Sequence, residues 1–146
     1  MSERALHLSD EMAAQMLGAA ARAFPLECCG LIEGIRTESG WRITALHETA
    51  NVAEDPAHRF VIDPQKQFEL MRAMRALRAS ETRIIGCFHS HPEGPPEPSA
   101  MDRAQSFEDD FLWLIAGGSA ESGFTLQAYV FTEESGFARI ALHEEG

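Results

Sequence analysis

Two histidines separated by one residue, with a serine and an aspartate after a proline-rich tract, have the residue types and spacing of a metal site. The stretch HSHPEGPPEPSAMD runs from His89 to Asp102, directly after the apolar run RIIGCF. Side chains at positions i and i+2 of a strand point to the same side, so His89 and His91 can direct both imidazoles to one point. Because histidine is a common ligand of zinc, the spacing predicts two metal ligands at the end of a strand.

A third ligand must come from elsewhere, and Asp102 is the nearest good candidate. If Ser99 caps a helix, Asp102 lies in the first turn of that helix and can turn back toward the strand. A His-His-Asp set leaves one tetrahedral position for water, which is typical of catalytic zinc, and zinc lowers the pKa of such a water to about 7. A carboxylate suits the task of taking the proton from that water.

Each of these signals also has an ordinary structural interpretation. Ser99 and Asp102 have the spacing of a helix capping pair, and a surface His-x-His pair is commoner than a metal site. Their combination in one strand–loop–helix segment favours the metal site, while the spacing leaves the identity of the metal open. Cys28, Cys29 and Cys87 are alternative thiol ligands or nucleophiles. Free cysteines, however, are usually small buried hydrophobic residues.

Composition and charge limit the class of protein. The 146 residues, 45% of them apolar, predict one soluble globular domain over residues 1–146. The net charge of -11, without a cluster of Lys and Arg, argues against nucleic-acid binding. The sequence contains no apolar run of the roughly 18 residues that a membrane span needs. The N-terminal segment lacks the pattern of a signal peptide, and three cysteines do not form a disulfide framework, so we expect a cytoplasmic protein.

The rest of the sequence predicts the elements that must position the candidate ligands. Apolar periodicity and turn residues predict helices over 8–24, 64–80 and 99–110, strands over 29–35, 41–50, 59–63, 83–91 and 111–118, and a closing hairpin over 125–144. Strands and helices do not alternate strictly enough for a doubly wound fold. We therefore predict an α/β (α+β) domain, in which a mixed, largely antiparallel sheet packs between helices. Phe68, Met74 and both tryptophans are expected in its core.

The stretch from His89 to Asp102 resembles the His-x-His-Pro-x(n)-Ser-x-x-Asp signature of the JAMM (MPN-plus) metalloproteases. The family pattern includes an upstream glutamate, which PLECCG supplies as Glu27, and NVAEDPAHRFVIDP (51–64) is similar to the family's linker. The resemblance extends over about residues 25–118, with every motif position filled. It implies an MPN/JAMM-like (cytidine-deaminase-like) domain and a zinc metallopeptidase.

The resemblance also implies a role for each matching residue. His89, His91 and Asp102 would be the zinc ligands. Glu27 would hold the metal-bound water and pass its proton to the departing amine. Ser99 would donate a hydrogen bond to the oxygen of the tetrahedral intermediate. Without the family pattern, Glu27 is one of many glutamates and would not be selected.

The compact chain has little room for the long insertions of eukaryotic, ubiquitin-chain-specific members. It resembles the short prokaryotic type, which acts on ubiquitin-like sulfur-carrier proteins with a C-terminal diglycine. The implied reaction is hydrolysis of the peptide or isopeptide-like bond after that diglycine, which removes C-terminal residues or releases cysteine. Two alternatives are a non-catalytic MPN-type binding scaffold and a zinc amidase acting on a small molecule. A homodimer is compatible with the acidic surface and the family resemblance.

Overall fold

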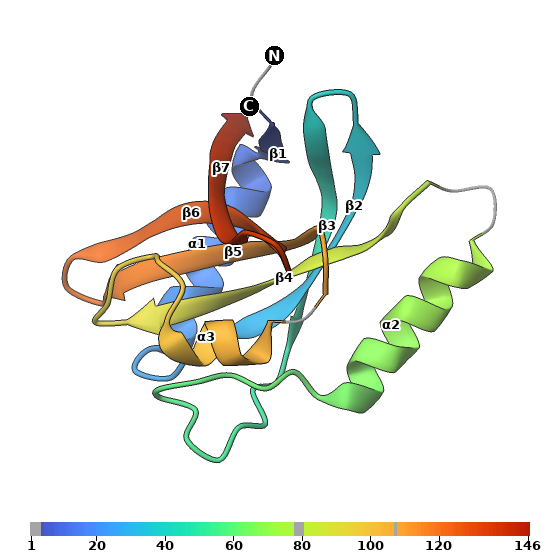
Figure 1. Cartoon of the computed structure of the whole chain (residues 1–146). Helices are drawn as coiled ribbons and strands as arrows, with labels where there is room; N and C mark the ends of the chain where they lie inside the picture. The colour runs from blue at the N-terminus through green and yellow to red at the C-terminus, as the bar shows by residue number, and fades with distance from the viewer. Residues whose placement is uncertain (1–3, 78–80, 107) are drawn as a thin grey trace.

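Strands and helices alternate irregularly along the chain, and the computed structural model describes residues 4–77, 81–106 and 108–146 (Figure 1). The elements in chain order are β1 (Ala5–Ser9), α1 (Asp10–Ala23), β2 (Cys29–Thr37), β3 (Gly40–Thr49), α2 (Pro64–Ala76), β4 (Arg83–Pro92), α3 (Ala100–Gln105), β5 (Phe111–Ser119), β6 (Gly123–Thr132) and β7 (Gly136–Glu145). Among these described elements, no helix is long and apolar enough to cross a membrane.

The strands form a closed barrel in the order β1-β3-β2-β4-β5-β6-β7. Neighbouring strands pair antiparallel in β2–β3, β2–β4, β5–β6 and β6–β7, and parallel in β1–β3, β1–β7 and β4–β5. The expectation of a mixed α+β domain is therefore confirmed. β4 carries the two histidines near its end and pairs with β2 and β5, so the candidate site is built on a strand that is held on both sides.

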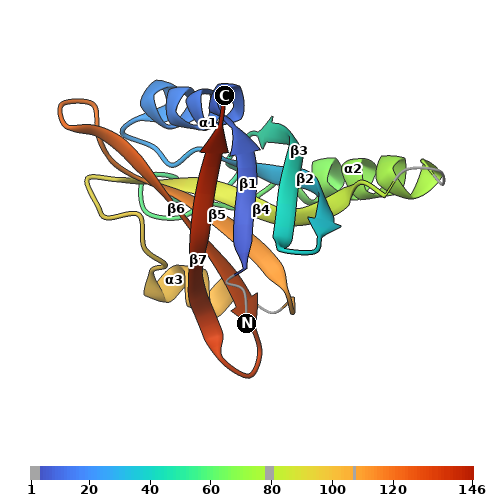
Figure 2. The same cartoon turned by 90° about the horizontal axis from the view of Figure 1, so that it is seen from above.

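The expectation of a sheet packed between helices is only partly right. Helices α1 and α3 do lie on opposite sides of the strands, as Figure 2 shows, but the strands between them close on themselves. The closure comes from β1, a strand that the sequence pattern does not predict. Three of its five residues pair in parallel with β3 and all five pair in parallel with β7, so β1 joins the two ends of the sheet. A strand this short, placed directly before a helix, carries too little alternation to be recognised.

The two faces of the barrel wall have separate cores. Helix α1 begins at Ser9, whose hydroxyl accepts a hydrogen bond from the backbone of Met12, as expected of an N-cap. Its buried face, including Met16, packs with apolar side chains of β1, β2, β3, β5 and β6. The opposite face buries Leu31, Phe60 and Trp113 together. Helix α3 lies on this side of the strands (Figure 1). This second face carries the candidate ligands.

Three of the expected elements differ from the sequence prediction. The helix expected over 99–110 is formed, among the described residues, only over Ala100–Gln105 (α3). Residues 59–63 form no strand, since only an isolated bridge joins Asn51 to Ile62. Helix α2 projects from the barrel in Figure 1 and buries only Met74, whereas Phe68 is 59% exposed. Helical spacing places Phe68 on the apolar stripe, but spacing cannot show whether anything covers that stripe. The predicted last residues of this helix, 78–80, lie outside the described residues.

Candidate metal centre

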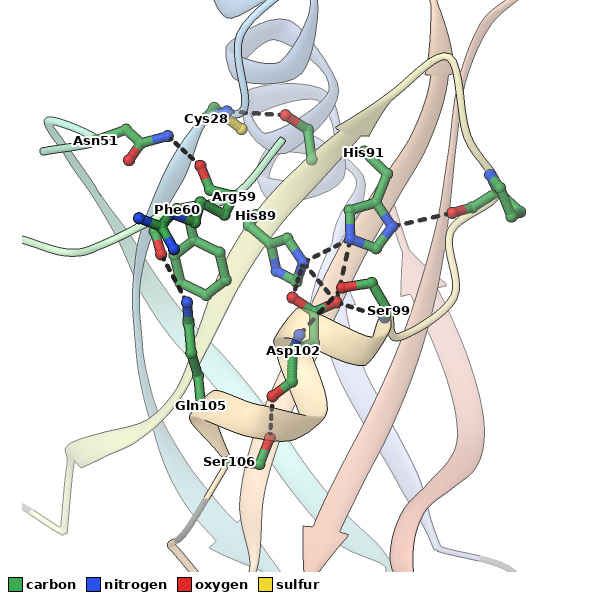
Figure 3. A network of polar contacts seen from close by, with 12 residues as sticks. Cys28, Asn51, Arg59, Phe60, His89, His91, Ser99, Asp102, Gln105 and Ser106 are labelled. Carbon is green, nitrogen blue, oxygen red and sulfur yellow. Dashed lines mark hydrogen bonds and ion pairs between the residues drawn. The ribbon is translucent and has the colours of Figure 1, made fainter. Parts of the chain in front are cut away.

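Strand β4 and helix α3 bring three potential ligands together. His89 and His91 extend from the same side of β4, and Asp102 turns back from the first turn of α3 (Figure 3). The two Nε2 atoms lie 2.9 Å apart, and each lies 3.1 Å from Oδ2 of Asp102. His89 is fully buried and Asp102 is 3% exposed. Three ligand atoms therefore converge on one point at the floor of the site.

Burial and the hydrogen bonds to Asp102 set the charges of this cluster in the metal-free protein. Burial lowers the pKa of His89, which favours the neutral imidazole whose lone pair can bind a metal. Burial by itself raises the pKa of Asp102, but hydrogen bonds from both histidines outweigh it and hold that pKa well below its usual range. For His91, burial lowers the pKa, and the hydrogen bond to Asp102 and its charge reverse the direction. The carboxylate therefore stays ionised.

The donor atoms fit a divalent metal such as zinc, which binds imidazole nitrogen and carboxylate oxygen. Nδ1 of His91 lies 3.1 Å from the carbonyl oxygen of Pro95. When Nδ1 donates to that carbonyl, loss of the Nε2 proton that binds Asp102 in the metal-free protein would leave a lone pair that faces the other two ligand atoms. Within the described part of the chain, this is the group of His, Cys, Asp and Glu side chains arranged to hold a metal ion.

Glu27 lies beside this cluster with its carboxyl group buried. The residue is 6% exposed, and Oε1 has no hydrogen-bond partner among the described residues. Burial raises the pKa of Glu27 to about 8, with the charge of His91 lowering it and that of Asp102 raising it further. A buried carboxyl group whose pKa lies near neutrality can both accept and return a proton.

The backbone around Glu27 is held on three sides. Its N–H donates to the carbonyl oxygen of Pro56 at 2.8 Å, and its own carbonyl oxygen accepts from Nδ2 of Asn51 at 3.1 Å. The next N–H, that of Cys28, donates to the hydroxyl of Ser90 at 2.8 Å. Ser90 lies between the two histidines and points to the opposite side of β4. The strand that carries the ligands therefore also fixes the segment that carries Glu27.

Asn51 is the organising residue of the loop between β3 and α2. Its Nδ2 also donates to the carbonyl oxygen of Arg59 at 3.0 Å, and its Oδ1 accepts from the N–H of Val61 at 3.0 Å. The side chain thus connects both ends of the loop to the segment of Glu27. The loop in turn delivers Phe60, whose ring stacks on His89 with 4.3 Å between centroids. This contact keeps the buried imidazole in place.

Ser99 serves first as the N-cap of α3. Its hydroxyl oxygen accepts from the N–H of Asp102 at 3.0 Å, and its N–H donates to Oδ2 of the same residue at 2.9 Å. The capping interpretation and the site interpretation are therefore both compatible with the structure. The proton of the hydroxyl is not used in any hydrogen bond with a described residue, and so it is free to be donated to a ligand.

The structure brings the predicted residues Glu27, His89, His91, Ser99 and Asp102 to one side of the barrel. The thiol alternative finds less support. Burial raises the pKa of Cys28 and Cys29 to about 11 and that of Cys87 well above its usual value, so none of these thiols is a ready nucleophile.

Sequence reasoning gave no role to Asn51, Ser90 or Phe60. The linker pattern contained Asn51 and Phe60, and strand alternation could have placed Ser90 on the side opposite the histidines. What the pattern could not show is which backbone groups they contact.

Comparison with known proteins gives the family. The family model for prokaryotic homologs of the JAB domain matches residues 9–131 of this chain. The desampylase of Haloferax volcanii is 33% identical over 91 residues, which cover 62% of each protein. A probable TtuB-protein conjugate cleaving protease of Thermus thermophilus is 31% identical over 81 residues, 56% of this chain and 49% of that protein. The matches thus span less than two thirds of these two relatives.

A solved structure supports the fold over nearly the whole chain. The solution structure of protein DSY2949 from Desulfitobacterium hafniense is 25% identical and has a TM-score of 0.80. The similarity covers 96% of this chain and 92% of that one. The barrel and its helices are therefore shared by a second protein over almost their full length.

Proposed function

The chain belongs to the family of prokaryotic homologs of the JAB domain, and we propose that it is a JAMM-type zinc hydrolase acting on conjugates of a ubiquitin-like carrier protein. The cleaved bond in this proposal is the peptide or isopeptide-like bond after the C-terminal diglycine of the carrier. The observation that carries the proposal is the convergence of His89, His91 and Asp102 beside the buried carboxyl of Glu27. A relative named as a conjugate-cleaving protease supports the substrate class.

His89, His91 and Asp102 would hold the metal. A zinc ion bound there supplies Lewis-acid polarisation of a carbonyl group and a lowered pKa of water. Glu27, with no hydrogen bond to a described residue at Oε1, takes the proton of the attacking water and returns it to the departing amine. Ser99 donates its free hydroxyl proton to the oxygen on which negative charge develops. Phe60 and Trp113 exclude water from the inner side of His89.

The substrate's tail limits how it can be recognised. A diglycine has no side chains, so its recognition must use backbone hydrogen bonds, as when an extended peptide adds to the edge of a sheet. We therefore expect the carrier's tail to bind in an extended conformation. A tail with alanine or valine in place of the glycines, cleaved as fast as the diglycine tail, would contradict this expectation.

Intact mass spectrometry tests the proposal. A diglycine-tailed carrier with a C-terminal extension is incubated with zinc-loaded protein, with and without a chelator. The expected result is a chelator-sensitive loss of mass that ends at the second glycine. Bound zinc without cleavage of any carrier conjugate would contradict the proposed substrate.

Two other outcomes separate the alternatives. If the protein binds no zinc and cleaves no conjugate, it would be a binding scaffold. Cleavage of short amides as fast as of carrier conjugates would indicate an amidase of small molecules. The cytoplasmic location and the homodimer stay predictions, for which fractionation of cells and light scattering are the measurements.

A further inference from the structure

The proline loop (residues 91–99) is held against the barrel by residues far from the ligands in sequence. Tyr129 of β6 is 7% exposed, and its hydroxyl oxygen lies 3.0 Å from the carbonyl oxygen of Pro96. Under the same loop lies Gly117 of β5. A Cβ atom added there would lie 2.3 Å from the nitrogen of Pro96 and 2.4 Å from the carbonyl carbon of Pro95. The loop backbone thus rests on β5 at a point where only hydrogen fits.

Gln127 is the second partner of the Tyr129 hydroxyl. The amide oxygen of Gln127 lies 2.7 Å from the hydroxyl oxygen of Tyr129. The phenol has one proton for two acceptors, the carbonyl oxygen of Pro96 and Oε1 of Gln127. A half-turn of the amide, which would place Nε2 opposite the phenol oxygen, would leave that proton to Pro96. Burial raises the pKa of Tyr129, which keeps this proton in place.

The same loop sets the ring of His91. The carbonyl oxygen of Pro95 accepts from Nδ1 of His91 at 3.1 Å and from the N–H of Glu97 at 2.8 Å. Pro95 and Pro96 are adjacent, and their rings fix φ, which limits how far one carbonyl can move without the other. Any loosening at Pro96 therefore changes the acceptor that orients His91.

We propose that Tyr129 and Gly117 are positioning residues for the metal centre. They hold the proline loop on the barrel and thereby direct Nε2 of His91 toward the other two ligand atoms. The inference rests on the proposed zinc site and extends it to residues outside the family signature. The tyrosine ring packs against Phe137 in the second core, so the ring contributes to packing while the hydroxyl makes the contact with the loop.

Tyr129→Phe separates the hydroxyl from the ring. Zinc affinity is measured by competition with a chromogenic chelator, and the variant is expected to bind about 10-fold more weakly, the lower end for partners that orient a ligand. With cobalt bound in place of zinc, Tyr129→Phe should have an absorption spectrum that differs from that of cobalt-loaded wild type. Thr125→Val is the matched control, because it removes an exposed hydroxyl from the same strand that has no hydrogen bond to a described residue. It should bind within about twofold of wild type.

Gly117→Ala tests the close approach of the loop. Its Cβ would meet backbone atoms, so the loop must move, and zinc affinity should fall about 100-fold. Gly94→Ala is the matched control in the same loop, since the nearest atom to its added Cβ is Cβ of His91 at 3.7 Å. That variant should keep the affinity and cobalt spectrum of wild type.

The outcomes distinguish this inference from the proposed function. If wild type binds zinc and Tyr129→Phe matches it in affinity and cobalt spectrum, the positioning role is overturned and the metal site stands. If wild type binds no zinc, the proposed metal site is overturned and the positioning role with it. A thermal melt of each metal-free variant shows whether Gly117→Ala lowers stability. If it does, the result for Tyr129→Phe alone decides the test.

Discussion

Two buried carboxyl groups interact electrostatically with His91, and the protein surrounds them in opposite ways. Asp102 accepts hydrogen bonds from His89, His91 and the N–H of Ser99, which outweigh its burial and hold its pKa well below the usual range. Among the described residues Glu27 has no such donor at Oε1, and burial raises its pKa to about 8. Environments that separate the pKa values of two carboxyl groups assign them different tasks. Asp102 is suited to bind a cation and Glu27 to exchange a proton.

Replacing Asp102 tests the binding half of this comparison and should have the largest effect. Asp102→Asn keeps the shape but removes the charge, so zinc affinity should fall at least about 100-fold and cleavage should be lost. Zinc competition and the mass assay measure both. Asp63→Asn, at the N-cap of α2, is the matched control and should change neither. An Asp102→Asn protein with wild-type zinc affinity would show that the carboxylate is not a ligand.

Replacing Glu27 tests the proton-transfer half. Glu27→Gln should lower kcat by about 10²- to 10⁴-fold, because general acid–base catalysis is lost, while zinc affinity changes little. Glu33→Gln, whose carboxylate contacts His47 on another part of the barrel, is the control. Loss of zinc together with activity in Glu27→Gln would contradict the separation of tasks.

Ser99 forms hydrogen bonds with Asp102, and its replacement should lower activity less than the replacement of Asp102 or Glu27. Ser99→Ala removes the proposed donor to the developing negative charge, so kcat should fall about 100-fold with little change in KM. It also removes a helix cap, which costs about 1 kcal/mol of stability. Ser9→Ala removes the cap of α1 and is the control for that loss. If Ser9→Ala and Ser99→Ala lower kcat equally, Ser99 acts as a cap alone.

The raised pKa of Glu27 predicts a smaller effect, on stability. In metal-free protein the folded state keeps the Glu27 proton up to about pH 8, whereas the ordinary pKa is 4.5. The folded state therefore binds more protons than the unfolded state in this window, and stability falls as pH rises from 4.5 to 8. Glu27→Gln has no ionisable carboxyl at this position, so its stability does not fall with pH for this reason. Above pH 8 it should be more stable than wild type by about 2 kcal/mol, less than the full pKa shift implies because buried sites relax.

Urea unfolding of both metal-free proteins at pH 5 and pH 8.5 measures this difference. The two proteins should have similar stability at pH 5 and diverge at pH 8.5. Equal stability at both values would mean that Glu27 is not held in the environment that distinguishes it from Asp102.

The sequence could predict the ligand cluster because its information is local. His89 and His91 share a strand, and a single turn of helix returns Asp102 to them. Glu27 was found only through the family pattern, since its approach depends on contacts with Pro56, Asn51 and Ser90. Such long-range backbone contacts leave no periodic signal in the chain.

The prediction of the fold from the sequence also failed where contacts are long-range. Alternation and turn residues predicted β2 to β7 closely, but barrel closure depends on β1, whose five residues pair with strands far away in sequence. Phe68 had the spacing of a core residue and is exposed, because an apolar stripe predicts burial only where another element covers it. The family membership, in contrast, was predicted from the motif residues and is confirmed by the match over residues 9–131.

X-ray absorption at the zinc edge of the zinc-loaded protein tests the central claim most directly. The account predicts a first shell of nitrogen and oxygen only, with the scattering pattern of two imidazoles, unchanged in Glu27→Gln. Sulfur in the first shell would identify a thiol from Cys28, Cys29 or Cys87 as a ligand. That result, or the loss of an oxygen ligand in Glu27→Gln, would contradict the assignment of Asp102 to binding and Glu27 to proton transfer.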